Sequence, residues 1–198
     1  SVLSVMFYIS KLSKRGKIIG RKYITRKSNY VCVIGGSNID ITGYPNGNFN
    51  QKDSNPGKVK TSLGGVARNI AENLSRLNVK VELITVLGTD SYARDIRSNC
   101  TENNINIMNS QLIPGFNTSV YVCINDKNGD MQCAISDMEI YSHITPRFIM
   151  SKLDIINSAI AVVIDTNMPT DTLEFIMSNV TVPIFMDTVS VKKAQKIK

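Results

Sequence analysis

Tyr30-Val31-Cys32-Val33-Ile34-Gly35-Gly36 is a short apolar, β-branched run that ends at two glycines. Such a run is typical of a strand buried on both faces of a sheet. Three further buried strands are indicated at residues 79–87, 159–164 and 183–186. Apolar residues at helical spacing predict helices at residues 64–77, 90–104 and 170–179. This alternation of strands and helices predicts an α/β fold, with helices covering a parallel sheet.

One region interrupts the alternation. Residues 118–124 and 131–136 have the pattern of two strands, joined by the polar link Asn125-Asp126-Lys127-Asn128-Gly129-Asp130. The Asn-Gly step in this link is a strong hairpin signal. We expect residues 38–43 and 58–62 to join these strands in a small separate sheet. A sheet outside the main one is a candidate lid over a bound ligand.

The net charge of +7 is concentrated in the N-terminal segment. Residues 1–28 hold eight bases and no acid, whereas residues 29–198 hold the other 15 bases against 16 acids. Any nucleic-acid contact is therefore expected at residues 1–28. Apolar residues at helical spacing stop at Gly16, and residues 17–24 suggest two short basic strands that turn at Gly20. This order resembles the last helix and wing of a winged helix-turn-helix DNA-binding domain, which predicts weak DNA contact. A solvated basic extension is the open alternative.

The sequence also argues against several classes of protein. No run approaches the roughly 18 apolar residues that a membrane span needs. The apolar opening, residues 1–10, is followed rather than preceded by bases, which is the reverse of a signal peptide. We therefore expect a cytoplasmic protein without membrane contact. The cysteines show no CxxC pair and the carboxylates no evident metal cluster, so we assign no metal ligand and expect buried free thiols. These are Cys32, Cys100, Cys123 and Cys133.

The pair Gly64-Gly65 lies where a strand is expected to pass into a helix. Two glycines leave no side chain between the backbone amides and a docking ligand, and the helix N-terminus adds unpaired N–H groups. Asn69, one turn into the helix, could reach the same point with a donor and an acceptor. This combination suits a polyhydroxylated ligand. The alternative is a tight turn with a glycine that serves only helix packing.

Asn38 and Asp40 form a second candidate cluster just after the first buried strand. Positions i and i+2 of an extended segment face the same way, so one amide and one carboxylate could bind neighbouring sugar hydroxyls. Ligands gather at the carboxyl ends of strands in open α/β sheets. The alternative is that Asp40 only caps a turn. No GxGxxG follows Gly35-Gly36, which argues against a dinucleotide fold.

These two clusters resemble motifs of the PfkB, or ribokinase-like, carbohydrate kinase family. Ile34-Gly35-Gly36-Ser37-Asn38-Ile39-Asp40 is similar to its opening strand and Asn-x-Asp element. Gly64-Gly65-Val66-Ala67-Arg68-Asn69-Ile70-Ala71 is similar to its first signature, with Gly88 at the distal glycine. Asn78 stands where that signature has Gly or Ser; Asn is well suited to a left-handed helix stop. The details of Gly65 to Asn73, and of Ser136-Asp137-Met138, look most like pseudouridine kinases.

The resemblance implies a three-layer α/β/α core with a small β-sheet lid, and transfer of the γ-phosphoryl of ATP, with Mg²⁺, to a ribose 5′-hydroxyl. The family's catalytic base lies in a Gly-Ala-Gly-Asp motif that does not occur in this sequence, so we assign no catalytic residue. We expect residues 29–198 to be the substrate-binding and lid portion of a kinase domain without its ATP-binding part, inactive alone, and able to dimerise through the lid. The sugar-binding positions matched by motif are Asn38, Asp40, Gly64, Gly65 and Asn69, with Asp137 and Asn167 as weaker candidates.

Three alternatives remain open. A ribokinase, adenosine kinase or fructokinase relative would share the Asn-x-Asp and Gly-Gly elements. A nucleoside- or sugar-sensing DNA-binding regulator would use residues 1–28 as its output. A truncated relative without activity would keep only the fold.

Overall fold

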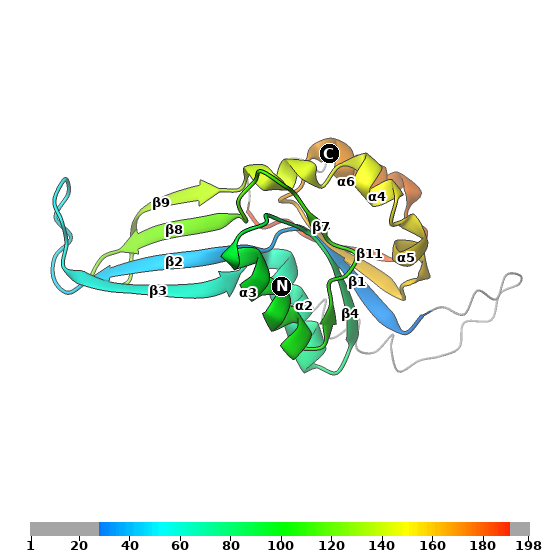
Figure 1. Ribbon diagram of the computed structural model, residues 1–198, viewed down its shortest axis with the longest axis horizontal. Coiled ribbons are helices and arrows are strands. Elements are labelled where there is room, and N and C mark those ends of the chain that lie inside the picture. The colour runs from blue at the N-terminus through cyan, green and yellow to red at the C-terminus, as the bar shows by residue number, and fades with distance from the viewer. Residues whose placement is uncertain (1–27, 191–198) are drawn as a thin grey trace, which may run out of the picture.

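A five-stranded parallel sheet forms the core of the computed structural model, which describes residues 28–190 (Figure 1). Its strand order is β11-β10-β1-β4-β6. Every neighbouring pair is parallel, as the strand–helix alternation predicted. The strands are β1 (Tyr30–Ile34), β4 (Lys80–Ile84), β6 (Ile105–Asn106), β10 (Ala161–Asp165) and β11 (Ile184–Asp187).

Helices cover both faces of this sheet, so the predicted three-layer α/β/α arrangement is confirmed (Figure 1). Successive residues of a strand point to opposite faces, and β1 divides accordingly. Val31 and Val33 pack with α2 (Val66–Arg76) and α3 (Ser91–Glu102). Cys32 and Ile34 pack in a second cluster on the other face. The elements of that cluster are η1 (Glu139–His143), α4 (Pro146–Met150), α5 (Leu153–Ser158) and α6 (Thr170–Asn179).

Particular residues define two of the helix ends. Asp90 caps α3, where its Oδ1 accepts a hydrogen bond from the Ala93 amide at 2.9 Å. Asn78 has a φ of 61°, the left-handed conformation expected for it just after α2. The predicted strand 79–87 instead divides into β4 and the short β5 (Val86–Leu87), which pairs with β7 (Gln111–Leu112) in a separate two-stranded sheet.

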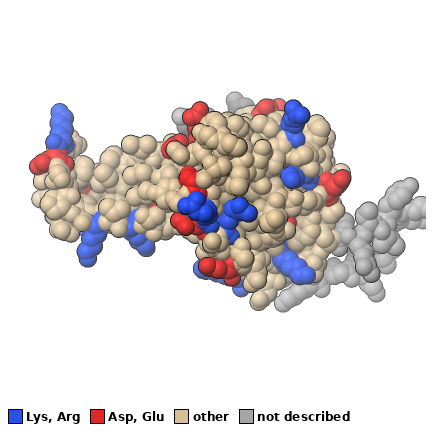
Figure 2. Space-filling model, viewed as in Figure 1, with Lys and Arg blue, Asp and Glu red and all other residues tan. Residues whose placement is uncertain are grey.

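The predicted small sheet is present and projects from the core as an arm (Figure 1). Its strand order is β3-β2-β8-β9, with bounds Gly57–Gly64, Asn38–Pro45, Val120–Asn125 and Met131–Asp137. The β8–β9 hairpin turns at the polar link that contains Asn128-Gly129. On the face shown in Figure 2, most charges of the arm lie at its tip and lower edge, while both signs mix over the core.

The two faces of this arm differ in chemistry. Ile39, Ile41 and Leu63 share one face and pack at its root against the α2–α3 side of the core. Asn38 and Asp40 point to the other face, which is the polar one. The root of the arm therefore anchors its apolar face in the core and presents its polar face to the ends of the core strands.

The prediction for the cysteines is right for two residues and wrong for two. Cys32 and Cys100 are buried, and burial raises the pKa of both thiols, that of Cys100 to about 11. Cys123 is half-buried and Cys133 exposed, because both lie on the arm, which no helix of residues 28–190 covers. No helix within residues 28–190 is long and apolar enough to cross a membrane. The winged-helix interpretation concerns residues that lie, apart from Ser28, outside those described.

Candidate functional site

Asn38 and Asp40 face the same side at the start of β2, immediately beyond the end of β1. The Asn38 Nδ2 donates a hydrogen bond of 2.6 Å to the Asp40 Oδ1. Asn38 is 4% exposed, whereas Asp40 is half-buried and open to a ligand. The Asn38 amide group thus helps to hold the Asp40 carboxylate in place. The Asn38 Oδ1 is left as a further acceptor on the same side.

The glycine pair lets two parts of the backbone approach this cluster closely. Gly64 lies opposite Asn38 in the β2–β3 ladder, and a β-carbon on it would lie 2.6 Å from the Asp40 Cγ. Gly65 has a φ of 94°, and its β-carbon would lie 2.5 Å from the Ser37 Cα. Gly64 therefore provides the space that the Asp40 carboxylate occupies. Gly65 provides the turn and the space that bring α2 against the loop after β1.

Asp165, at the end of β10, joins three segments of the site and was not identified from the sequence. Its fully buried carboxylate accepts hydrogen bonds from the backbone amides of Gly36 (2.8 Å), Ala67 (3.1 Å) and Asn167 (2.8 Å). Burial raises the pKa of Asp165, although these hydrogen bonds act in the opposite direction. Asp165 therefore fixes the loop after β1 and the start of α2 to the end of β10.

The helix N-terminus is less available to a ligand than the sequence suggested. The Ala67 amide donates to Asp165, and the Arg68 amide donates to the Gly36 carbonyl at 3.3 Å. These bonds satisfy two of the N–H groups that a helix start leaves unpaired. The expectation of a row of unpaired amides is therefore corrected: only the turn at Gly65 and Val66 remains to face a ligand.

A buried tyrosine lies beneath the loop after β1. Tyr141, in η1, is 2% exposed, and its ring lies so close to Gly36 that a β-carbon there would be 3.0 Å from the phenol oxygen. Burial raises the pKa of Tyr141, and the negative charges of Asp165 and Asp40 raise it further. The Tyr141 hydroxyl therefore stays protonated.

The remaining candidates are placed differently. Asn69 is exposed in the first turn of α2, and its Oδ1 accepts a hydrogen bond from the Arg68 guanidinium. Asn167 follows β10 and is held to Asp165 through its backbone amide. Asp137 pairs with Val120, which pairs with Ile39. Because paired residues share a face, Asp137 lies on the opposite face from Asp40. The structure thus brings together Asn38, Asp40, Gly64 and Gly65, and it separates Asp137 from them.

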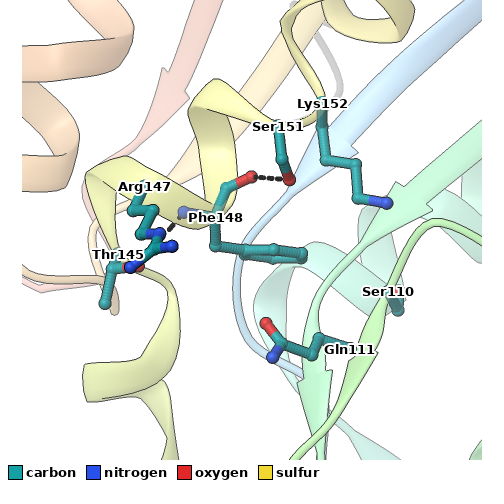
Figure 3. Close-up of a pocket in the computed structure, with 7 residues that line it drawn as sticks. All are labelled: Ser110, Gln111, Thr145, Arg147, Phe148, Ser151 and Lys152. Atoms are coloured by element: carbon teal, nitrogen blue, oxygen red, sulfur yellow. Dashed lines mark hydrogen bonds between the residues drawn. The ribbon is translucent and has the colours of Figure 1, made fainter.

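A cavity of about 390 Å³ lies elsewhere, between α4 and β7 (Figure 3). None of the residues predicted for the sugar site lines it. Arg147 and Lys152 lie on opposite sides of the Phe148 ring, so their charges do not converge on one point (Figure 3). Its lining residues are Ser110, Gln111, Thr145, Arg147, Phe148, Ser151 and Lys152.

Comparison with known proteins gives consistent results for sequence and fold. The sequence profile of the pfkB family carbohydrate kinases matches residues 28–191. A pseudouridine kinase of Escherichia coli is 37% identical over 174 residues, which cover 87% of this chain and 56% of that protein. The uncharacterized sugar kinase YeiI of Escherichia coli is 33% identical over 195 residues, covering 98% and 54%. Ribokinase from Thermotoga maritima shares the fold, with a TM-score of 0.72 at 16% identity, covering 83% and 54%.

The chain therefore spans about half the length of the curated relatives it matches. The family match begins at residue 28, so it lends no support to the winged-helix interpretation of residues 1–28, which stays a prediction. The α/β core with its parallel sheet is the ribokinase-like fold. By its sequence from residue 28 onward, and by this fold, the chain belongs to the pfkB family of carbohydrate kinases.

Proposed function

We propose that this chain supplies the substrate-binding and lid half of a kinase that phosphorylates the ribose 5′-hydroxyl of a nucleoside, with pseudouridine as the substrate. The observation that carries this proposal is the arrangement of Asp40 against Gly64, with Asn38 beneath it. A half-buried carboxylate, next to a buried amide that keeps a free acceptor oxygen, can bind a pair of sugar hydroxyls. The 37% identical pseudouridine kinase favours pseudouridine within that class.

In the proposed reaction, the 5′ oxygen of the ribose forms a bond to the γ-phosphorus of ATP. The bond from that phosphorus to the leaving oxygen of ADP breaks, and the hydroxyl proton passes to a base. The described residues contribute to this reaction by holding the sugar. Because phosphoryl transfer depends mainly on positioning and on stabilising charge, a sugar site alone gives almost no rate.

We assign no site for Mg²⁺ or a triphosphate to the side chains of residues 28–190. Within this part of the chain no three His, Cys, Asp or Glu side chains come together as a metal ligand set. The Gly-Ala-Gly-Asp sequence of the family does not occur in the 198 residues. We therefore assign ATP handling and the base to sequence other than that described.

The proposal is tested by calorimetric binding of pseudouridine, uridine, adenosine and ribose to the purified chain, with ATP turnover measured in parallel. We expect pseudouridine to bind most tightly and no nucleoside to be phosphorylated. Preference for free ribose or adenosine would instead support a ribokinase or adenosine kinase relative. Turnover above background would show that a catalytic base is present in these 198 residues.

The basic N-terminal segment favours a second candidate function, that of a nucleoside-sensing DNA-binding regulator. Its eight bases without an acid lie ahead of the kinase-family match, which begins at residue 28. The match to YeiI covers 98% of this chain and so includes most of that segment. We propose a boundary between residues 28 and 29, with DNA contact on the first side and the kinase portion on the second. Pairing of two lids in a homodimer is a further proposal that the family suggests.

A further inference from the structure

Arg68 is a buried cation whose five N–H donors are all used within the protein. The residue is 3% exposed and lies in the first turn of α2. Its Nε donates to the Gly64 carbonyl at 3.0 Å, and its Nη2 donates to the Leu63 carbonyl at 3.0 Å and to the Asn69 Oδ1. Its Nη1 donates to the Glu72 carboxylate at 2.6 Å and to the Asn99 Oδ1 at 3.2 Å. A guanidinium has five such donors and no acceptor, so none remains for a ligand.

These contacts decide which way the Asn69 amide faces. The guanidinium can only donate, so the atom of Asn69 that meets it must be the oxygen. The Nδ2 group, with its two N–H donors, then points away from Arg68. An exposed Asn would otherwise be free to present either its oxygen or its nitrogen to a ligand.

The same arginine also holds the backbone beside the other candidate ligands, Asn38 and Asp40. Its Nε contacts the Gly64 carbonyl, and a β-carbon on Gly64 would lie 2.6 Å from the Asp40 Cγ. Asn38 and Asp40 present acceptors, the Asn38 Oδ1 and the Asp40 oxygens, because the Asn38 amide group already donates to Asp40. The contacts of Arg68 therefore connect Asn69 with the backbone beside these acceptors.

We propose that Arg68 is a positioning residue that sets Asn69 as a hydrogen-bond donor facing the acceptors of Asn38 and Asp40. A ligand hydroxyl is both donor and acceptor, so neighbouring hydroxyls of a sugar can accept from Asn69 and donate to Asn38 and Asp40 at once. Ligands that lack a hydroxyl proton or a hydroxyl oxygen at this point leave either these acceptors or the Asn69 donor unpaired. This inference rests on the proposed function and adds which side chain donates and which accepts each hydrogen bond to the ligand.

The test replaces the donor group of Asn69 and keeps its contact with Arg68. In Asn69→Asp, one carboxylate oxygen keeps the contact with Arg68 and the other presents an acceptor to the ligand. We expect the thermal midpoint to stay the same or rise, and pseudouridine binding measured by calorimetry to weaken at least about tenfold. Asn104→Asp is the matched control, because it makes the same change of charge on an exposed residue just beyond α3, beside the C-terminal end of α2. It should bind pseudouridine within about twofold of wild type, since the site lies at the other end of α2. Equal affinity of Asn69→Asp and Asn104→Asp would overturn the proposal.

A second measurement separates this inference from the proposed function. Side-chain ¹⁵N relaxation should show a rigid Asn69 amide in wild type and a mobile one in Arg68→Lys, which lacks the fork of donors. If wild type binds none of pseudouridine, uridine, adenosine or ribose, the proposed function fails while this result still supports the anchoring by Arg68. An Asn69 amide that is as mobile in wild type as in Arg68→Lys overturns the inference, whatever the protein binds.

Discussion

Replacement of Gly64 or Gly65 by alanine should have different consequences. The first change should mainly weaken ligand binding, and the second should mainly destabilise the fold. In Gly64→Ala the new methyl group would lie 2.6 Å from the Asp40 Cγ, which is a side-chain atom. The carboxylate can rotate away, at the cost of its hydrogen bond from Asn38. A charged hydrogen bond contributes about 1.5–3 kcal/mol, and replacing a strand glycine returns about 0.5–1 kcal/mol. We therefore expect the free energy of unfolding to fall by only about 1–2 kcal/mol.

In Gly65→Ala the new methyl group meets backbone that cannot rotate away. It would lie 2.5 Å from the Ser37 Cα, at a φ of 94° that side chains other than glycine rarely adopt. A strained backbone costs about 1–3 kcal/mol and overpacking about 1–3 kcal/mol more. The variant should therefore lose at least about 2 kcal/mol, and its thermal midpoint should fall by at least about 5 °C.

Urea unfolding followed by circular dichroism, with calorimetric binding of pseudouridine, distinguishes the two outcomes. Gly64→Ala should bind at least about tenfold more weakly while it remains folded at 25 °C, because Asp40 has left its position. If Gly64→Ala binds as tightly as wild type, Asp40 is not the ligand contact we infer. If Gly65→Ala is as stable as wild type, the close approach of α2 to the loop after β1 is refuted.

Four further predictions concern single features. Asp40→Ala should weaken pseudouridine binding at least about tenfold by calorimetry, and Asp40→Asn less, because it keeps the shape without the charge. Asp165→Asn should lower the free energy of urea unfolding by about 1.5–3 kcal/mol, since one of its backbone donors then faces an N–H group, whereas the exposed Asp171→Asn should stay within about 0.5 kcal/mol. Burial raises the pKa of Asp90, but hydrogen bonds from Thr118 and Ala93 outweigh it and hold that pKa below its ordinary value. The ionised Asp90 thus contributes fully to stability above about pH 3.9, and this contribution is lost as the pH falls through the lower pKa. Asp90→Asn lacks this titration, so its free energy of unfolding should fall less steeply with acid pH than that of wild type. The chain should bind DNA weakly, with an affinity that falls steeply with salt and does not depend on DNA sequence, and removal of residues 1–28 should abolish this binding. Tight binding to one DNA sequence would contradict the winged-helix remnant.

The parts of the fold that were predicted correctly have local signals. Buried strands such as β1 are continuous β-branched runs, and α2 and α3 carry one apolar stripe each. The segment from Glu139 to Ser158 was missed because it consists of three helices of only five or six residues. A helix of that length shows less than two turns of periodicity, so no apolar stripe can be recognised in it.

The candidate site was only partly predictable because much of it depends on distant backbone. Two of the three partners of Asp165 are amides 129 and 98 positions earlier in the chain, and a backbone amide carries no sequence signal. The face on which Asp137 lies depends on the register in which β9 pairs with β8, and a shift of one residue moves every side chain to the other face. Asn38 and Asp40 could be placed together because their relation is local, two residues apart on one strand.

The charges at this site argue for a neutral, hydroxyl-rich ligand. The buried anion Asp165 is surrounded by backbone amides, and the buried cation Arg68 is paired with Glu72 and four neutral acceptors. Both ions are therefore satisfied by the protein and would be left poorly paired if a ligand displaced these partners. Among the candidate residues that the structure brings together, the charge that remains open to a ligand is the carboxylate of Asp40. An anionic sugar acid at this point would meet that carboxylate with no opposing cation, whereas the hydroxyls of a ribose can donate to it. We therefore expect the proposed site to select against negative charge on the part of a ligand that lies next to Asp40.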